Sequence, residues 1–348
     1  MIVVVTGSTG FIGRHLVDAL LDQGAEVRAL VRPETPRDRC DPRVGHWEAD
    51  LLDDRSVRES PIWQGATQVY HLAGVTKGRT LDQFRAGNVI PTANVLAALA
   101  GRGGKAPRIV LVSSQAAAGP ASSGDAPVRE SERPAPIEAY GRSKLQAEQA
   151  TLRYRNVLPI TIVRPSSVYG PGDRDFLNVF RQERRRIAVR AVPRDHALSL
   201  VHVRDLVRAL LVAAGQTVAV GRTYFVADER PVTWGELYDA IDRVIGHTPV
   251  GVPLPALVRD VAARGGDLVS AITGRATIVN RNKARLAHPR WWLCDSSLAR
   301  EELGWKSEVP LLDGLREAYN WYVEARWLKP PNTSPRGPKQ ATTEESST

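Results

Sequence analysis

Cysteine is almost absent from this sequence of 348 residues, since Cys40 and Cys294 are its only two. Two cysteines so far apart cannot build a disulfide framework or a zinc site, and no metal site is expected. The chain also lacks an apolar run of the roughly 18 residues needed to cross a bilayer. Its apolar start, IVVVTG, indicates a buried strand and not a secretory signal. We therefore expect a cytoplasmic protein without stable membrane insertion.

Lysine is scarce too, with 7 residues against 40 arginines, although the formal net charge is +9. A basic chain raises the question of nucleic-acid binding, but acidic residues are interspersed with arginine along almost the whole sequence. The densest basic run has a helical pattern and is interpreted as a solvated face or an anion-attracting rim; it consists of Arg184, Arg185, Arg186 and Arg190. We expect no nucleic-acid partner.

Hydrophobic patterning alternates in the first half of the chain between short β-branched runs and helical periodicity. Strands are predicted at 2–6, 26–32, 67–74, 108–114 and 158–165, and helices at 12–24, 88–100 and 139–154. This βαβ order predicts a parallel sheet with helices on both faces. Later elements are predicted at 199–214 (strand into helix), 222–228 (strand), 233–246 (helix), 253–275 (interrupted helix), 297–305 and 311–328 (helices).

The segment VTGSTGFIG places Gly7, Gly10 and Gly13 between the first strand and the following helix. Glycine permits a tight turn and close approach of the backbone to a pyrophosphate. The helix N-terminus adds N–H donors and a partial positive charge. The spacing is G-x-x-G-x-x-G and not G-x-G-x-x-G. In this strand–turn–helix context it predicts a dinucleotide site in preference to a plain βα turn.

The segment EAYGRSK places Tyr140 and Lys144 one helical turn apart, so both side chains can face one pocket. A tyrosine has a pKa of about 10. We expect the ammonium, and an oxidised nicotinamide, to lower it by favouring phenolate. The lysine can also hold the nicotinamide ribose hydroxyls. A tyrosine and a lysine at this spacing occur fairly often by chance, so the pair alone does not establish a catalytic site. The segment LVSSQAAAG supports one, because it ends a predicted strand and places Ser113 and Ser114 where ligands bind in open α/β sheets.

Together these segments resemble the extended short-chain dehydrogenases/reductases of the NAD-dependent epimerase/dehydratase group. The resemblance runs in the family's order from residue 2 to about residue 328. It rests on TGSTGFIG (6–13), ADLLD (49–53), HLAG (71–74), NVIPT (88–92), VSSQAAAG (112–119), YGRSK (140–144), RPSSVYGPG (164–172), VHVRDL (201–206) and CDSSLAREELGW (294–305). It implies an α/β, doubly wound parallel-sheet Rossmann fold with a smaller C-terminal substrate lobe.

By this resemblance, Ser114, Tyr140 and Lys144 match the catalytic triad, and Ser114 is preferred to Ser113 because it lies five residues before Gly119. The cofactor-binding positions that the resemblance implies, besides Tyr140 and Lys144, are Gly7, Thr9, Gly10, Phe11, Ile12 and Gly13 in the turn, Asp50 and Leu51 beside the adenine, Ala73 and Gly74 over the phosphates and ribose, and Pro165 against the nicotinamide. Asn88 matches a family position whose role is more often structural. His71 and His202 are expected to be core histidines.

The end of the second predicted strand bears on the cofactor's phosphate. An acidic residue there accepts hydrogen bonds from the adenosine ribose 2′-OH in NAD sites. This strand ends at Val31 and Arg32 without a carboxylate. Arg32 can pair with a 2′-phosphate and Arg14 can add a second charge, although Glu34 is near enough to reach a ribose. The sequence favours NADP and leaves NAD open.

The expected reaction is hydride transfer between nicotinamide and a carbonyl or hydroxyl carbon, with Tyr140 as the acid/base. Nucleotide-sugar members of the family usually carry an arginine where this chain has Leu198, and Arg194 lies four residues earlier. The departure favours an apolar ketone or alcohol as the small-molecule substrate. A nucleotide-sugar epimerase/dehydratase is the alternative, and a non-catalytic dinucleotide-binding sensor or assembly protein the second. A homodimer is left open.

The expected division of the chain follows from these assignments. Residues 1–170 form the dinucleotide-binding core, to which 199–228 return. Residues 171–328 mainly form the substrate-binding lobe. Residues 329–348 have the composition of a disordered tail.

Overall fold

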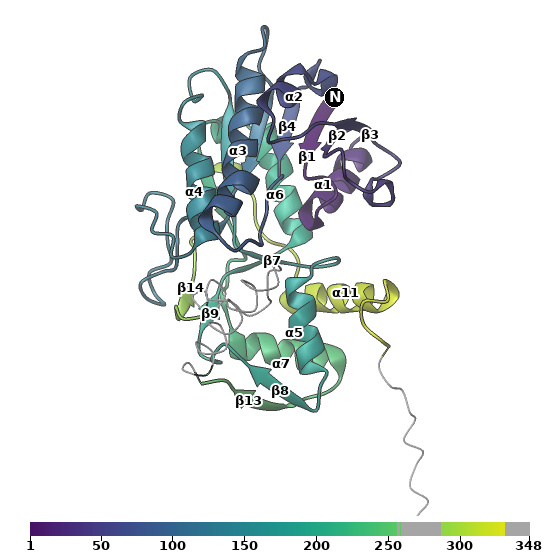
Figure 1. Ribbon diagram of the computed structural model, residues 1–348. Helices are drawn as coiled ribbons and strands as arrows, with labels where there is room; N and C mark the ends of the chain where they lie inside the picture. Colours follow the sequence, from purple (N-terminus) through teal and green to yellow (C-terminus); the bar gives the residue numbers. More distant parts are fainter. Residues whose placement is uncertain (256–257, 259–286, 331–348) are drawn as a thin grey trace, which may run out of the picture.

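The computed structural model describes residues 1–255, 258 and 287–330. Its centre is a sheet of seven strands, namely β1 (Ile2–Thr6), β2 (Glu26–Val31), β3 (Gly45–Glu48), β4 (Gln68–His71), β5 (Arg108–Val112), β6 (Ile160–Pro165) and β11 (Thr223–Val226). They lie in the order β3-β2-β1-β4-β5-β6-β11, and every neighbouring pair is parallel (Figure 1). The predicted doubly wound sheet is confirmed, with its change of direction between β1 and β4, where such folds bind ligands.

Helices cover both faces of the sheet. They are α1 (Phe11–Asp22), α2 (Asp54–Glu59), α3 (Leu81–Ala100), α4 (Ala139–Thr151) and α6 (Val203–Gly215). Successive side chains of a strand point to opposite faces. Val3 and Val5 of β1 therefore pack with α1 and α6, whereas Val4 packs with α3. Helix α4 lies against α3.

Helix α3 begins earlier than the sequence indicates. It was expected from residue 88, with Pro91 near its start, but Thr80 caps it by accepting a hydrogen bond from the Gln83 backbone N–H at 3.2 Å. Pro91 consequently lies inside the helix, where proline has no N–H to donate. Packing of α3 against the sheet and α4 outweighs this local cost, because tertiary contacts supply most helix stability.

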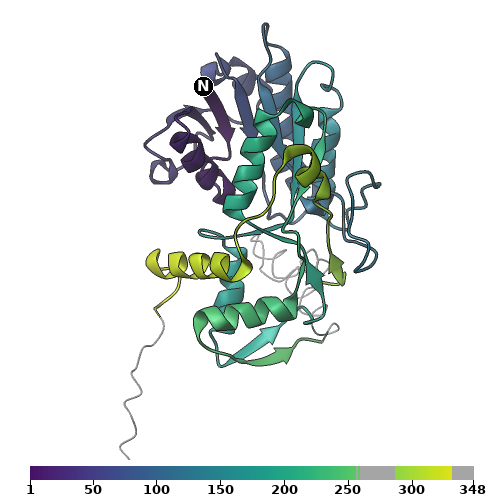
Figure 2. The same cartoon turned by 180° about the vertical axis from the view of Figure 1, so that it is seen from behind.

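The remaining elements form a second lobe, which lies beyond the carboxyl ends of the sheet strands (Figures 1 and 2). Its strand pairs are β7 (Ser167–Tyr169) with β10 (Leu200–His202), β9 (Ala197–Leu198) with β12 (Val232–Thr233) and β14 (Trp291–Trp292), and β8 (Ile187–Arg190) with β13 (Val250–Pro253). Its helices are α5 (Asp175–Glu183), α7 (Trp234–Ile245) and α11 (Leu311–Glu324), packed around an aromatic core that includes Phe180 and Tyr322. Helix α10 (Ser297–Leu303) is not part of this lobe. It packs into the core between the sheet and helices α1 and α6.

The basic run after α5 differs from its predicted helical structure. It was expected to be helical, but Arg184 ends α5 and Arg190 ends strand β8. The intervening Ile187, Ala188 and Val189 alternate between exposed and buried positions, as a half-buried strand requires.

Two further predictions fall largely outside the described residues. The expected helix over 253–275 is described only at 253–255 and at Val258, and the expected tail only at Lys329 and Pro330. The carbonyl oxygens of Lys329 and Pro330 accept hydrogen bonds from the Arg184 side chain at 2.5 and 3.2 Å. Among the helices that the structure describes, none combines the length and the apolar character needed to cross a bilayer.

Candidate active site

The glycine-rich turn joins β1 to α1 and is shaped by close backbone contacts. Gly7 has a φ of +76°, and a Cβ atom there would lie 2.8 Å from the backbone nitrogen of Ala73. A Cβ atom on Gly13 would overlap the carbonyl oxygen of Gly7. Gly10 is the N-cap of α1 and, as a glycine, has no side chain to cap the amide groups of the first turn. Such a cradle fits a pyrophosphate held by backbone N–H groups.

His71 fixes the neighbouring turn. Its Nδ1 atom lies 2.8 Å from the Thr6 hydroxyl and its Nε2 atom 3.0 Å from the Thr92 hydroxyl. The Thr6 hydroxyl in turn accepts a hydrogen bond from the Ala73 N–H at 3.1 Å. Burial, aided by the Lys144 charge, lowers the pKa of His71 to about 3, so the imidazole stays neutral. As the sequence predicts, it is a core histidine, and so is the fully buried His202, whose ring caps α6.

The structure brings Ser114, Tyr140 and Lys144 together from two elements. Ser114 follows the carboxyl end of β5, and Tyr140 and Lys144 lie in the first two turns of α4. The Tyr140 and Ser114 side chains are hydrogen bonded. The Lys144 Nζ atom donates to the carbonyl oxygen of Val112 at 2.6 Å. Ser113 points elsewhere, because its hydroxyl donates to a Glu148 carboxylate oxygen at 2.5 Å.

The pKa of Tyr140 departs from the sequence-based expectation. Desolvation raises it to about 12, the Glu138 carboxylate adds to the rise, and the Ser114 hydrogen bond opposes it. The Phe84 ring contributes to this apolar setting, with its centroid 6.0 Å from that of Tyr140. The expected lowering by Lys144 is wrong for the protein without cofactor, since the ammonium is directed at the end of β5. Tyr140 therefore keeps its proton at neutral pH.

Lys144 is buried, and desolvation lowers its pKa to about 8 against the opposing attraction of Glu148. Glu148 lies one turn further along α4, where the Arg164 guanidinium binds both its carboxylate oxygens at 2.9 and 2.6 Å. Both side chains of this ion pair are 6% exposed. The pair joins α4 to β6.

Gly74 and Asn88 complete the wall beside Lys144. The Asn88 amide oxygen accepts from the Val75 N–H at 2.7 Å, and its nitrogen donates to the Ser143 hydroxyl at 2.8 Å. A Cβ atom on Gly74 would lie 2.8 Å from that amide oxygen and 4.0 Å from the Lys144 Nζ atom. Asn88 thus holds the turn and α4 in place, which is the structural role expected of it.

Other predicted positions lie along the same edge of the sheet. Pro165 is the last residue of β6, two residues after Val163, whose carbonyl accepts a hydrogen bond from the Ser113 N–H at 2.7 Å. Leu51 is buried after β3, and its carbonyl accepts from Asn94 at 2.9 Å. Asp50 is exposed, and its side chain accepts from the Leu52 N–H at 2.9 Å.

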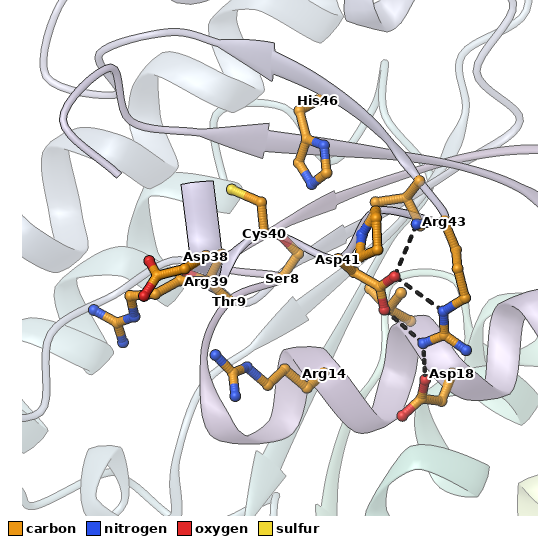
Figure 3. A pocket seen from close by; sticks show the side chains of 13 residues that line it. Ser8, Thr9, Arg14, Asp18, Asp38, Arg39, Cys40, Asp41, Arg43 and His46 are labelled. Atoms are coloured by element: carbon orange, nitrogen blue, oxygen red, sulfur yellow. Dashed lines mark hydrogen bonds and ion pairs between the residues drawn. The ribbon is translucent and has the colours of Figure 1, made fainter. Parts of the chain in front are cut away.

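A cavity of about 350 Å³ opens between the glycine-rich turn and the segment that precedes β3 (Figure 3). It is lined by Ser8, Thr9, Arg14, Val17, Asp18, Asp38, Arg39, Cys40, Asp41, Pro42, Arg43, Val44 and His46. Arg43 is bound by the Asp41 and Asp18 carboxylates, so Arg14 and Arg39 are the lining arginines without a carboxylate partner among the described residues. Arg32 is not part of the lining; it pairs with Glu34 at 3.3 Å, and both side chains are 66% exposed.

Thr9 and Arg14 of this cavity wall are predicted from the sequence, whereas Arg39 and the rest of the segment before β3 are not. The signal was present in RDRCDPR (37–43), a charged segment between two strands that follows the glycine-rich turn closely in sequence. Its placement depends on β3, a four-residue strand that is only partly buried and was not predicted.

The sheet is parallel and has the Rossmann strand order, with a glycine cradle at its first turn. A serine, a tyrosine and a lysine lie together beyond β5. This combination defines an oxidoreductase of the short-chain dehydrogenase/reductase type. The sequence model of the NAD-dependent epimerase/dehydratase family matches residues 3–227. The chain belongs to this family, as the sequence motifs indicated.

Two curated relatives are reductases by name. The chain is 32% identical over 332 residues to a ceramide reductase of Caulobacter vibrioides, covering 94% of this chain and 96% of the relative. It is 30% identical over 329 residues to a 4-hydroxy-2-methyl-3-oxo-4-farnesyl-3,4-dihydroquinoline-1-oxide ketoreductase of Stigmatella aurantiaca, covering 90% and 95%.

Solved structures share the fold. One is the UDP-glucuronic acid 4-epimerase of Bacillus cereus in complex with UDP-glucuronic acid and NAD, with a TM-score of 0.73 and 21% identity over 93% of this chain and 100% of that one. At this identity the likeness supports the fold alone.

Proposed function

We propose that this enzyme reduces the carbonyl group of an apolar substrate, with NADPH as the preferred reductant. The observation that carries the proposal is the pairing of Tyr140 with Ser114 at the carboxyl end of β5, where the two side chains are hydrogen bonded. A protonated tyrosine is the form that a general acid needs for reduction.

Each triad residue has a distinct task in this proposal. Ser114 holds the substrate oxygen against Tyr140, and Tyr140 gives its proton to that oxygen. Lys144 holds the nicotinamide ribose hydroxyls with the hydrogens not given to Val112. When bound, the dinucleotide supplies the hydride. We assign its contacts to Gly7, Thr9, Gly10, Phe11, Ile12, Gly13, Asp50, Leu51, Ala73, Gly74 and Pro165, besides Tyr140 and Lys144.

The environment of Leu198 and Arg194 favours an apolar substrate. Leu198 is buried in the core of the second lobe, where an arginine would meet a nucleotide diphosphate in sugar-nucleotide enzymes of the family. Arg194 is bound by both Asp239 carboxylate oxygens, at 2.9 and 2.7 Å, which neutralises its charge. The names of the ceramide reductase and the quinoline ketoreductase agree with a ketone or alcohol in an apolar molecule.

Nucleotide-sugar epimerisation or dehydration is the second candidate. The family's name favours it. The two candidates differ in their use of reductant. Net consumption of NADPH with a panel of ketones supports reduction, whereas conversion of a UDP-sugar without net cofactor consumption overturns it. Cofactor binding without any turnover would favour the sensor or assembly protein.

The choice of NADP rests on the cavity beside the glycine-rich turn. Arg14 and Arg39 line it, and Arg32 stands in solvent nearby. A guanidinium can bind a 2′-phosphate through two charge-assisted hydrogen bonds. We assign the binding of the 2′-phosphate to Arg14 and Arg39. Arg32, which the sequence predicts for this role, is the alternative.

The test is titration of the purified protein with NADPH and NADH at one ionic strength. Arg14→Ala and Arg39→Ala should each weaken NADPH binding about tenfold or more and leave NADH binding unchanged. Arg32→Ala measures the sequence-based assignment in the same way, and Arg55→Ala on α2 is the control. Equal losses for both cofactors, or tighter NADH binding by the wild type, would overturn the NADP assignment.

The proposal also includes three expectations about the second lobe, the location in the cell and the oligomeric state. The second lobe is taken as the substrate-binding part, the location as cytoplasmic, and a homodimer as an open possibility. Analytical ultracentrifugation measures the last of these directly.

A further inference from the structure

The β8–β13 ribbon closes the end of the second lobe that lies farthest from the seven-stranded sheet (Figures 1 and 2). The two strands are parallel, with Ile187 opposite Val250 and Val189 opposite Val252. Partners in register share a face of the sheet, and residues two apart do so as well. These four side chains therefore form one face, here termed the ribbon face.

The inner side of the ribbon is firmly packed. Ala188 is fully buried, and the Arg190 guanidinium lies 4.4 Å from the Tyr238 ring centroid of α7. Arg190 also binds Glu183 of α5 at 2.7 Å. The orientation of the ribbon is thus fixed by a buried ion pair and a cation–π contact.

The four side chains of the ribbon face, by contrast, are exposed. Ile187, Val189, Val250 and Val252 are 58, 45, 68 and 43% exposed. A registered cluster of aliphatic side chains on the outside of a protein commonly marks an interaction site. Threonine is also a good strand former, so strand formation does not require these four side chains to be aliphatic.

Arginines without an ion-pair partner among the described residues border this face. Arg185 and Arg186 immediately precede Ile187, are exposed, and make no ion pair in the described part of the chain. His247, just after α7, bonds the Arg185 carbonyl at 3.1 Å, and this contact brings the end of α7, with the exposed Arg243, to the same border. The acidic groups packed against the ribbon, Glu183 and Asp242, face inward and are occupied by Arg190.

We propose that the ribbon face, with its arginine border, docks this enzyme on the surface of an anionic lipid bilayer. Aliphatic side chains that enter the headgroup region and arginines that meet lipid phosphates are the two contributions that such peripheral binding needs. The inference goes beyond the proposed function, because it concerns where the protein sits and not what it reduces.

Two other occupants fit less well. Residues 331–348 follow Pro330, which accepts a hydrogen bond from Arg184, but their sequence contains no valine, leucine, isoleucine, methionine or aromatic residue. A second copy of the chain would have to bury roughly 800 Å² per partner for a stable contact. Four half-exposed side chains offer far less apolar area, and the flanking arginines would meet their like charges across a two-fold axis.

The experiment is co-sedimentation of the full-length protein, without substrate or cofactor, with two kinds of vesicle. One contains phosphatidylcholine alone and the other about one third phosphatidylglycerol. We expect binding to the anionic vesicles that weakens at high salt. Arg185→Gln with Arg186→Gln should lower the partition coefficient about tenfold or more. Threonine at all four ribbon-face positions should lower it to a similar degree, because the apolar contribution is lost and strand propensity is kept.

The matched control lies in the turn between α4 and β6, at the opposite end of the sheet strands. Leu152 and Val157 are 61 and 60% exposed there, beside the exposed Arg153 and Arg155. Exchanging these four residues for threonine and glutamine should leave vesicle binding unchanged.

Three outcomes would overturn the proposal: wild-type protein that stays in the supernatant, equal binding to both kinds of vesicle, or unchanged binding by both ribbon variants. A concentration-dependent dimer that the threonine variant abolishes would also overturn it, and would assign the ribbon face to a second copy. Ultracentrifugation of the same samples reads out that case. Unchanged circular dichroism of the arginine variant guards against loss of the fold.

Discussion

The Lys144 Nζ atom donates a hydrogen bond of 2.6 Å to the carbonyl oxygen of Val112, the last residue of β5. This contact ties α4 to the strand end that carries Ser113 and Ser114. It keeps the ammonium buried, where its charge is costly, and directs it at the end of β5.

Tyr140→Phe should lower turnover about 10²- to 10⁴-fold, the usual range for a general acid, with cofactor affinity little changed. Phenylalanine keeps the ring contact with Phe84 and removes only the hydroxyl. Tyr154→Phe, beyond the end of α4, is the control and should behave as wild type. Steady-state kinetics and cofactor titration measure both effects. Full activity of the Tyr140 variant would refute the assigned role.

The pH profile of reduction should have a single descending limb. Tyr140 keeps its proton throughout the neutral range, because its pKa is about 12. Lys144, with a pKa of about 8, loses its charge as the pH rises through that value. We therefore expect kcat/KM for the cofactor, which reports the free enzyme, to be level below pH 8 and to fall above it. A level profile up to pH 10 would show that the lysine charge is not needed.

Lys144→Met should stabilise the fold at neutral pH while abolishing function. The pKa of Lys144 is about 8 in the folded state against an ordinary 10.5, so the unfolded chain binds more protons between these values and stability rises with pH there. The buried charge costs about 3 kcal/mol at pH 7 and about 1 kcal/mol at pH 10.

The measurement is urea unfolding of both proteins at the two pH values. Loss of the Val112 hydrogen bond offsets about 1 kcal/mol of the gain at either pH. The stability difference between variant and wild type should nevertheless shrink by about 2 kcal/mol from pH 7 to pH 10. A difference independent of pH would contradict the lowered pKa.

Glu148→Gln should destabilise the fold by about 3 kcal/mol, because it leaves the buried Arg164 charge without its partner. Glu59→Gln is the matched control: its pair with Arg55 is 64 and 82% exposed, and such surface pairs contribute about 1 kcal/mol or less. Urea unfolding at pH 7 compares the two. Similar losses for both variants would mean that Arg164 finds water or another acceptor once Glu148 is neutral.

The sequence alone determined the parts of the site that depend on neighbours along the chain. Gly7, Gly10 and Gly13 sit in one turn, and Tyr140 and Lys144 are one helical turn apart, so their juxtaposition follows from local geometry. The β-branched runs likewise predicted the inner strands of the sheet, because such segments can be buried on both faces.

Only the tertiary structure decided what depends on burial and on contacts distant in sequence. The pKa of Tyr140 rises because desolvation outweighs the Ser114 hydrogen bond, and no spacing rule contains that balance. Arg39 reaches the cavity beside Arg14 because the weakly patterned β3 pairs with β2. Arg185 and Arg186 border a strand and not a helix because α7 and α5 supply partners for the inner side of β8. Pairing and burial are properties of the packed chain, and local sequence leaves them undetermined.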